Sequence, residues 1–335
     1  MISLCEINNF GPLDYIKWNN IAKINLIIGK NACGKTFLLK ILYSAIRTIE
    51  EYGRGNEPRH ISDILSEKLY WTFQVNRLSD LVQKGEENLS FSLQDGLAKL
   101  FSYQFGSSTE KRIQTVENQL SPRNANSLFI PAKEILSLFH IVKKSRDIDK
   151  MFGFDDTYLD LVRAIEVEAM KGKNFEQFSL ARKKLETMLN GKIAFENNEW
   201  VYKQGNGRFP IHTASEGIKK FAIFDRLLGN RYLSPESIVF IDEPEAALHP
   251  SALVAFLDIV AMLASVGIQF FIASHSYFVI KKFVLLAREK QQTIITVSFD
   301  DNQIKYFDLR QGMPDNPIID ESIRLYEQDV EMSLR

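Results

Sequence analysis

The segment GKNACGKT, residues 29–36, constrains this chain more than any other, because its spacing G-x-x-x-x-G-K-[ST] is that of a phosphate-binding loop. It follows an apolar strand expected over Ile24–Ile28 and precedes a helix expected over Lys35–Ile49, where apolar residues recur at helical spacing. Such a pattern should arise in roughly one random chain of this length in a hundred. Its place between a strand and a helix makes chance a poorer explanation still.

Each position of this loop has a chemical role in binding ATP. Glycines let backbone N–H groups turn inward around phosphates, and the N-terminus of the next helix adds its dipole. Lys35 is predicted to reach the β- and γ-phosphates, and Thr36 to ligate Mg²⁺. The predicted nucleotide-binding residues of the loop are Gly29, Lys30, Asn31, Ala32, Cys33, Gly34, Lys35, Thr36 and Phe37.

Two adjacent carboxylates end a second apolar strand in SIVFIDEP, residues 237–244. Asp242 is predicted to hold Mg²⁺ together with Thr36, and Glu243 to orient and polarise the attacking water. Adjacent acids also occur in solvated turns at strand ends. Their position downstream of a phosphate-binding loop favours the catalytic interpretation.

Two weaker motifs accompany these. In HTASEGIKKF, residues 212–221, Thr213 or Ser215 is expected to cap a helix, and Thr213 with Glu216 fits a capping box. Taken alone, this segment favours a plain capped helix over an anion site by about two to one. His275 follows a strand expected over Ile268–Ala273, at the edge where a doubly wound sheet binds ligands, so it could reach a γ-phosphate. A lone histidine at a strand end is more often structural, but its distance after the Asp-Glu pair favours a functional role.

Periodicity along the chain predicts its organisation. Residues 1–50 and 190–310 are expected to form one split α/β head, 51–189 a mainly helical insertion, and 311–335 a C-terminal tail. No sustained heptads occur, so a long coiled-coil arm is not expected. The further predicted elements are strands Leu128–Ile130 and Ser237–Ile241, helices Glu134–Lys144, Tyr158–Met170 and Pro250–Ala264, hairpins Gly191–Ile211 and Thr293–Leu309, and a short helix from Glu321.

The chain resembles the ABC-type ATPases, in particular their SMC, RecF and OLD-like branch, in the order of four motifs: GKNACGKT, SEG, VFIDEP and SHS. The Asn9-Phe10 pair near the start and EPEAALHP, residues 243–250, are similar to segments of that branch. The resemblance covers residues 1–48 and 190–280. It implies a P-loop NTPase fold, a mixed sheet flanked by helices, and a homodimer with ATP and Mg²⁺ between its copies. Ser215 and Gly217 would contact the γ-phosphate on the opposite protomer, His275 would be the switch histidine, and Lys133 or Glu134 is the nearest match to a Q-loop residue.

Composition limits the partners. The chain has 41 Lys and Arg residues and 42 Asp and Glu residues, a formal charge of -1. It therefore lacks the overall positive charge typical of nucleic-acid-binding proteins, although a local DNA-binding patch stays possible. Cys5 and Cys33 have no pairing pattern. No leader pattern and no apolar stretch of about 18 residues is present, so we expect a cytoplasmic protein without a membrane anchor.

Sixty residues follow His275, whereas the Toprim nuclease of OLD-like proteins needs on the order of a hundred. The resemblance therefore implies a separate effector, a nuclease or toxin, in an antiphage or toxin-like system. The insertion and Ser322–Arg335 are the surfaces where we expect a partner or DNA. Two alternatives stay open. One is the ATPase subunit of a transporter. The other is a nucleotide-dependent scaffold with little hydrolysis, in which the unusual Ser-Glu-Gly-Ile at 215–218 favours a stable closed state.

Overall fold

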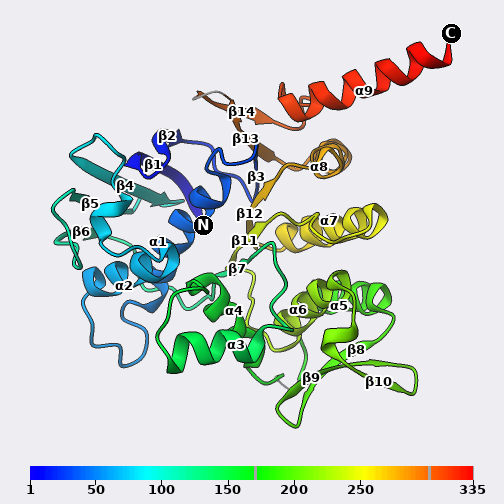
Figure 1. The fold of residues 1–335 in the computed structure, drawn as a ribbon, viewed down its shortest axis with the longest axis horizontal. Helices are drawn as coiled ribbons and strands as arrows, with labels where there is room; N and C mark the ends of the chain where they lie inside the picture. Colours follow the sequence, from blue (N-terminus) through cyan, green and yellow to red (C-terminus); the bar gives the residue numbers. More distant parts are fainter. Residues whose placement is uncertain (170–171, 301–302, 335) are drawn as a thin grey trace.

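A central sheet organises the computed structural model, which describes residues 1–169, 172–300 and 303–334. Within this part of the chain the sheet has six strands, in the order β14-β13-β3-β12-β11-β7 (Figure 1). All its neighbouring pairs are parallel except that of β13 and β14. Its strands are β3 (Ile24–Gly29), β7 (Leu128–Ile130), β11 (Ile238–Asp242), β12 (Gln269–Ser274), β13 (Ile294–Asp300) and β14 (Gln303–Asp308).

The central strands are buried on both faces, as their continuous apolar runs predict. Leu26, Ile241 and Ile272 enter one hydrophobic core, whereas Ile27 and Phe240 enter the other. Helices α7 and α8 cover the first face, and α1 covers the second (Figure 1). The helices are α1 (Lys35–Glu51), α2 (Ile61–Phe73), α3 (Phe139–Lys143), α4 (Asp156–Glu166), α5 (Glu176–Leu189), α6 (Glu216–Gly229), α7 (Pro250–Ser265), α8 (Tyr277–Glu289) and α9 (Pro317–Ser333).

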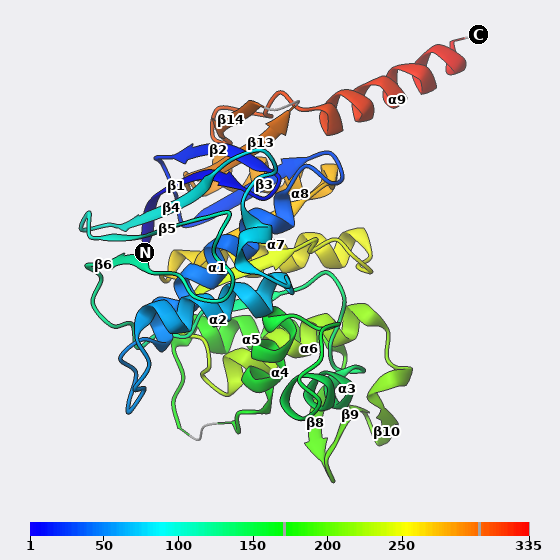
Figure 2. The ribbon, with the colours of Figure 1, turned by 60° about the vertical axis from the view of Figure 1, so that its left-hand side comes forward.

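A second, antiparallel sheet in the order β2-β1-β4-β5-β6 packs on the α1 side of the central sheet (Figure 2). Its inward residues, such as Phe91 and Phe101, share a core with α1 and with Phe240 and Phe271 of the central strands. A smaller sheet, β10-β9-β8, lies beyond α5. The strands of these two sheets are β1 (Ile2–Phe10), β2 (Leu13–Trp18), β4 (Asn88–Asp95), β5 (Leu100–Gly106), β6 (Thr115–Asn118), β8 (Lys192–Glu196), β9 (Glu199–Gln204) and β10 (Gly207–Pro210).

Most predicted elements near the motifs are present. Strands β3, β7, β11 and β12, helices α1 and α7 and the β13–β14 hairpin occur where the periodicity indicated. The β8–β9 hairpin turns at Asn197 and Asn198, whose φ angles of 52° and 65° are those that asparagine tolerates. Helix α9 begins at Pro317 and not at Glu321, because the Asn316 side chain accepts the N–H of Ile318 and caps it.

The insertion differs most from its prediction. Strands β4, β5 and β6 lie within 51–189, and their alternating apolar residues were a signal that the helical interpretation missed. The helix expected over Glu134–Lys144 begins only at Phe139, and Glu134 instead accepts the backbone N–H of Ser137. Helix α4 ends at Glu166, and Met170 lies outside the described residues.

The division of the chain at residues 50 and 190 remains a proposal. Strand β4 pairs with β1, and β7 pairs with β11, so parts of 51–189 complete both sheets of the head. In the described part of the chain, every helix is too short or too polar to cross a membrane.

Candidate functional site

The loop after β3 turns sharply, and its glycines are required for the turn. Gly29 and Gly34 have φ angles of 153° and 98°, which favour glycine. A Cβ on Gly34 would lie 2.7 Å from Leu13 Cδ2, and one on Gly29 would lie 2.9 Å from the Phe299 carbonyl oxygen. Gly34 caps α1, and its carbonyl accepts the Leu38 N–H at 2.9 Å. The loop and the helix N-terminus therefore form the compact turn that the motif predicts.

Lys35 points back into this loop. Its side chain is buried, and Nζ donates to the carbonyl oxygens of Gly29 at 2.8 Å and Lys30 at 2.7 Å. Cys33 Sγ lies 3.9 Å from the same nitrogen. The ammonium is thus held at the centre of the loop, where phosphate charge would be neutralised.

Thr36 and Asp242, predicted as metal ligands, are in contact. Thr36 Oγ1 donates to Asp242 Oδ1 at 3.1 Å and Oδ2 at 2.9 Å. Burial raises the pKa of Asp242 to about 6; the Thr36 hydroxyl opposes this rise, and Glu243 adds to it. A hydroxyl and a carboxylate this close are the hard oxygen donors that Mg²⁺ prefers, so the pair fits that ion.

Glu243 and His275 face each other across the ends of β11 and β12. Glu243 Oε1 lies 3.4 Å from His275 Nδ1. Glu243 adopts a left-handed φ of 47°, and its N–H donates to the Ala273 carbonyl at 2.9 Å. The parallel pairing of β11 with β12 brings these two predicted residues together from 32 positions apart in the sequence.

Glu245 joins these two loops, a role that the sequence prediction did not include. Its Oε1 accepts from Ser274 Oγ at 2.8 Å and from the His275 N–H at 3.0 Å. The same oxygen lies 3.7 Å from His275 Nδ1. The half-buried carboxylate therefore fixes the backbone at His275.

Lys35, Thr36, Glu243 and His275 border one open cavity of about 750 Å³. Phe73 of α2 lies in the wall of this cavity, and the centroids of the Phe73 and Phe37 rings are 4.6 Å apart. No signal in the sequence indicated this neighbour. Ser215 and Gly217 are not among the described residues that line it. The lining residues are Asn31, Ala32, Gly34, Lys35, Thr36, Phe37, Lys40, Phe73, Glu243 and His275.

Ser215 caps α6, its Oγ accepting the Ile218 N–H at 3.4 Å. The predicted capping box of Thr213 and Glu216 is wrong: Thr213 lies in a preceding 3₁₀ turn, where its hydroxyl donates to the Pro210 carbonyl. A Cβ on Gly217 would approach Leu248 Cδ2 to 3.1 Å, so the glycine allows α6 to pack closely on the loop after β11.

Lys220, one turn into α6, contacts the same loop. Its buried ammonium donates to the carbonyl oxygens of Glu243 at 3.1 Å, Ala246 at 3.2 Å and Pro244 at 3.5 Å. Burial lowers the pKa of Lys220 to about 8, although Glu245 and other nearby acids oppose this shift. The preceding Lys219 instead pairs with Glu134 at 3.2 Å.

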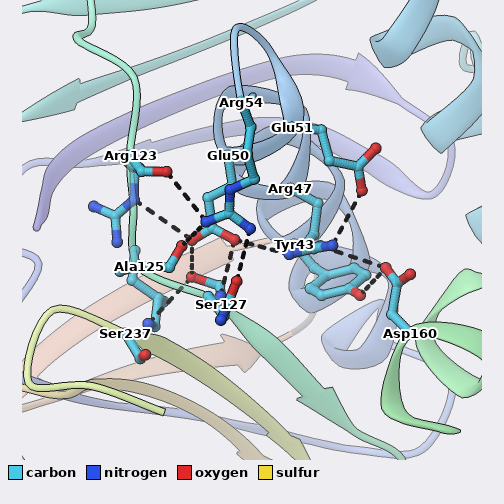
Figure 3. A network of polar contacts seen from close by, with 12 residues as sticks. Tyr43, Arg47, Glu50, Glu51, Arg54, Arg123, Ala125, Ser127, Asp160 and Ser237 are labelled. Carbon is cyan, nitrogen blue, oxygen red and sulfur yellow. Dashed lines mark hydrogen bonds and ion pairs between the residues drawn. The ribbon is translucent and has the colours of Figure 1, made fainter. Parts of the chain in front are cut away.

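A buried polar network fixes the far end of α1 (Figure 3). Glu50 accepts the N–H of Ser127 at 2.8 Å and its hydroxyl at 2.5 Å, next to β7. Arg47 pairs with Glu50 at 3.1 Å and with Asp160 of α4 at 3.4 Å, and Tyr43 donates to Asp160. The helix that carries Lys35 is therefore tied to two elements of the segment 51–189, the start of β7 and α4.

Comparisons with known proteins identify the class. Residues 24–281 match the family described as "AAA domain, putative AbiEii toxin, Type IV TA system". The chain belongs to this family. No curated protein matches its sequence.

Two solved structures are similar over nearly their whole length. An Smc head bound to the C-winged helix domain of ScpA has a TM-score of 0.56 at 15% identity, covering 92% of this chain and 98% of that one. An Smc head with an extended coiled coil, bound to the C-terminal domain of ScpA from Pyrococcus furiosus, has a TM-score of 0.54 at 12% identity, covering 98% and 99%.

The predicted P-loop NTPase fold is confirmed: the chain has the fold of the Smc head structures, a mixed α/β architecture with helices flanking its sheets. Its family and fold are those of ATP-binding ATPases, in which a nucleotide is typically bound with Mg²⁺.

Proposed function

We propose that this protein binds and hydrolyses ATP as a dimeric switch that controls a separate effector. The observation that carries the proposal is the convergence of Lys35, Thr36, Glu243 and His275 on one cavity, with Asp242 behind Thr36. These groups come from three separate parts of the chain. A purely structural role gives no reason for them to meet.

Each side chain has a task in this mechanism. Lys35 neutralises the β- and γ-phosphates, while the backbone of 29–34 surrounds them. Thr36 and Asp242 would hold Mg²⁺, which supplies charge neutralisation of the phosphates when bound. Glu243 orients and polarises the attacking water. His275, 3.4 Å from Glu243, is positioned to hydrogen-bond the γ-phosphate beside that water.

Dimer formation through ATP is supported by the location of Ser215 and Gly217. They stand at the N-terminus of α6, a favourable anion site, but outside the described lining of their own chain's cavity. We infer that they complete the site of a second copy. ATP would then join the two copies, and hydrolysis would release them.

Mixing two inactive variants tests this arrangement. Lys35→Ala damages the phosphate loop and Ser215→Arg blocks the opposing helix, so each homodimer should be inactive. In a mixed dimer, one interface contains both damaged halves and the other contains neither. Random exchange makes half the dimers mixed with one good site of two, so about a quarter of wild-type sites should return.

Trapped nucleotide should be counted beside released phosphate, because cooperativity between sites lowers turnover. Ser215→Ala serves as a control that removes the hydroxyl without blocking the approach. Absence of recovery by both measures, after confirmed subunit exchange, would show that the site is built within one chain.

The controlled effector is proposed to be a nuclease or toxin in a cytoplasmic antiphage or toxin-like system, with DNA as a possible trigger. The family's description as a toxin-like AAA domain supports this class of role. Co-expression with the product of an adjacent gene, in wild-type and Lys35→Ala form, tests it by growth and DNA integrity. Equal growth in both strains would contradict ATP-gated control.

A nucleotide-dependent scaffold is the second candidate, favoured by the Ser-Glu-Gly-Ile segment at 215–218, where the bulk of Glu216 limits close approach of a nucleotide to the backbone. Steady-state ATP turnover with and without DNA separates the two. Stable ATP-bound dimers with negligible turnover under both conditions would favour the scaffold.

A further inference from the structure

Helix α9 projects from the body with little of its surface covered (Figures 1 and 2). Its root is fixed: Asn316 is buried and donates to Ser298 Oγ at 2.6 Å, and Ile319 is buried in the core of the α7–α8 face. Beyond that turn, the apolar side chains are exposed. In proteins, most of the stability of a helix comes from packing its apolar face, and most of α9 lacks that packing.

Four of the exposed apolar residues form one stripe, which we call the α9 stripe, while Leu325 and Met332 lie off it. They continue from Ile319 at spacings of four, three, four and four, which keeps them on one helical face. Tyr326 and Leu334 are 70% and 83% exposed. The α9 stripe consists of Ile323, Tyr326, Val330 and Leu334.

Charge restricts what can cover this stripe. Within Pro317–Ser333 there are five acidic residues and one basic residue, Arg324, which pairs with Glu321. Two α9 helices packed together would place acids against acids. Nucleic acid and anionic membrane surfaces would also repel the helix. The occupant must therefore offer an apolar surface with basic residues beside it.

The chain itself carries such a surface. Ile141 and Ile148 are 56% and 74% exposed, seven residues apart on α3 and the π-helical turn that extends it, and Met151 and Phe152 follow. We call Ile141, Ile148, Met151 and Phe152 the α3 patch. Residues 139–152 contain four basic and two acidic side chains.

Two cations beside the α3 patch are available to a partner. Lys144 and Lys150 are exposed, and neither ammonium pairs with any residue in the described parts of the chain. Lys143 and Arg146 of the same segment already form ion pairs within the chain, with Glu166 and Asp156 respectively. An acidic helix docked here would pair Lys144 and Lys150 while burying both apolar surfaces.

The stripe and the patch of one chain cannot meet each other. In both views α9 leaves the top of the molecule and points away, whereas α3 lies in its lower part (Figures 1 and 2). We propose that the α9 stripe docks on the α3 patch of a second copy, and that two copies exchange these helices reciprocally. This contact needs no nucleotide and is separate from the proposed ATP interface.

The test measures the mass of the full chain carrying Lys35→Ala, without nucleotide, by light scattering over a range of protein and salt concentrations. The Lys35 change removes the ATP-dependent dimer, so failure of one interface does not imply failure of the other. We expect a dimer that weakens with salt. Tyr326→Glu should raise its dissociation constant at least about tenfold, because an aromatic anchor is lost.

Charge reversal makes the assignment specific. Lys144→Glu with Lys150→Glu should give a monomer, and adding Glu327→Lys and Glu331→Lys should restore the dimer. Leu325→Glu, on another face of α9, is the matched control and should leave the mass unchanged. A chain that stays monomeric at every concentration, or a dimer insensitive to Lys144 and Lys150, would overturn the proposal.

Discussion

Replacing Lys220 by Met should separate the positioning of the catalytic loop from nucleotide binding. The Lys220 ammonium donates to three backbone carbonyls of the turn at 243–246, in which Glu243 holds a left-handed φ of 47°. Met has similar length but cannot donate. A charge-assisted hydrogen bond contributes about 2 kcal/mol. If that energy positions Glu243 for catalysis, its loss should lower kcat by roughly 30-fold. ATP affinity should change little, because Lys220 does not line the cavity.

The pH dependence of the free energy of unfolding should also reveal the state of Lys220. The pKa of Lys220 is lowered from 10.5 to about 8, which corresponds to about 3 kcal/mol of cost for the charged form in the folded state. Below pH 8 both folded and unfolded chains carry the proton and the cost is fully present. Between pH 8 and 10.5 the folded chain has lost the proton while the unfolded chain still binds it, so the cost is relieved. The free energy of unfolding of the wild type should therefore rise relative to Lys220→Met over that range.

The assay combines urea unfolding at several pH values with kcat and ATP affinity at pH 7. Lys219→Met is the matched control, since Lys219 is also buried but pairs with Glu134 and not with the turn. The free energy of unfolding of Lys219→Met should change between pH 8 and 10.5 by as much as that of the wild type. A stability difference between wild type and Lys220→Met that is constant with pH would refute the lowered pKa. An unchanged kcat would refute the positioning role.

The remaining predictions concern the cavity. Lys35→Ala should abolish ATP binding, because the cation held between the Gly29 and Lys30 carbonyls is lost; near-normal affinity by titration calorimetry would contradict the phosphate-loop assignment. Glu243→Gln should keep ATP affinity but slow hydrolysis at least about 100-fold, since an amide cannot polarise water as a carboxylate does, and turnover at the wild-type rate would place the base elsewhere. The Mg²⁺-dependent part of ATP binding should weaken as pH falls through about 6, where Asp242 gains a proton and loses its capacity as a ligand. Asp242→Asn should remove that pH dependence, and a profile identical to that of the wild type would exclude Asp242 as the titrating group.

The sequence alone determined the parts of this protein that depend on neighbours along the chain. The phosphate loop, the acids after β11 and the cap at Ser215 are local patterns, since backbone turns, helix starts and buried strands leave their mark within a few residues. The order of the motifs was enough to indicate the ABC-type fold. The same local interpretation failed for β4, β5 and β6, which join the sheet through β4, and β4 pairs with β1 from more than eighty residues away.

Only the tertiary structure decided which groups meet. Glu245 reaches the backbone of His275 from 30 residues away, Phe73 packs on Phe37 from another helix, and Lys220 joins α6 to the turn beside Glu243. No local pattern encodes these contacts, because they follow from how parallel strands align and how helices pack over the sheet. The exposure of the α9 stripe is of the same kind. The sequence shows the amphipathic spacing of the stripe. Only the folded structure shows that the stripe projects from the body without a covering surface.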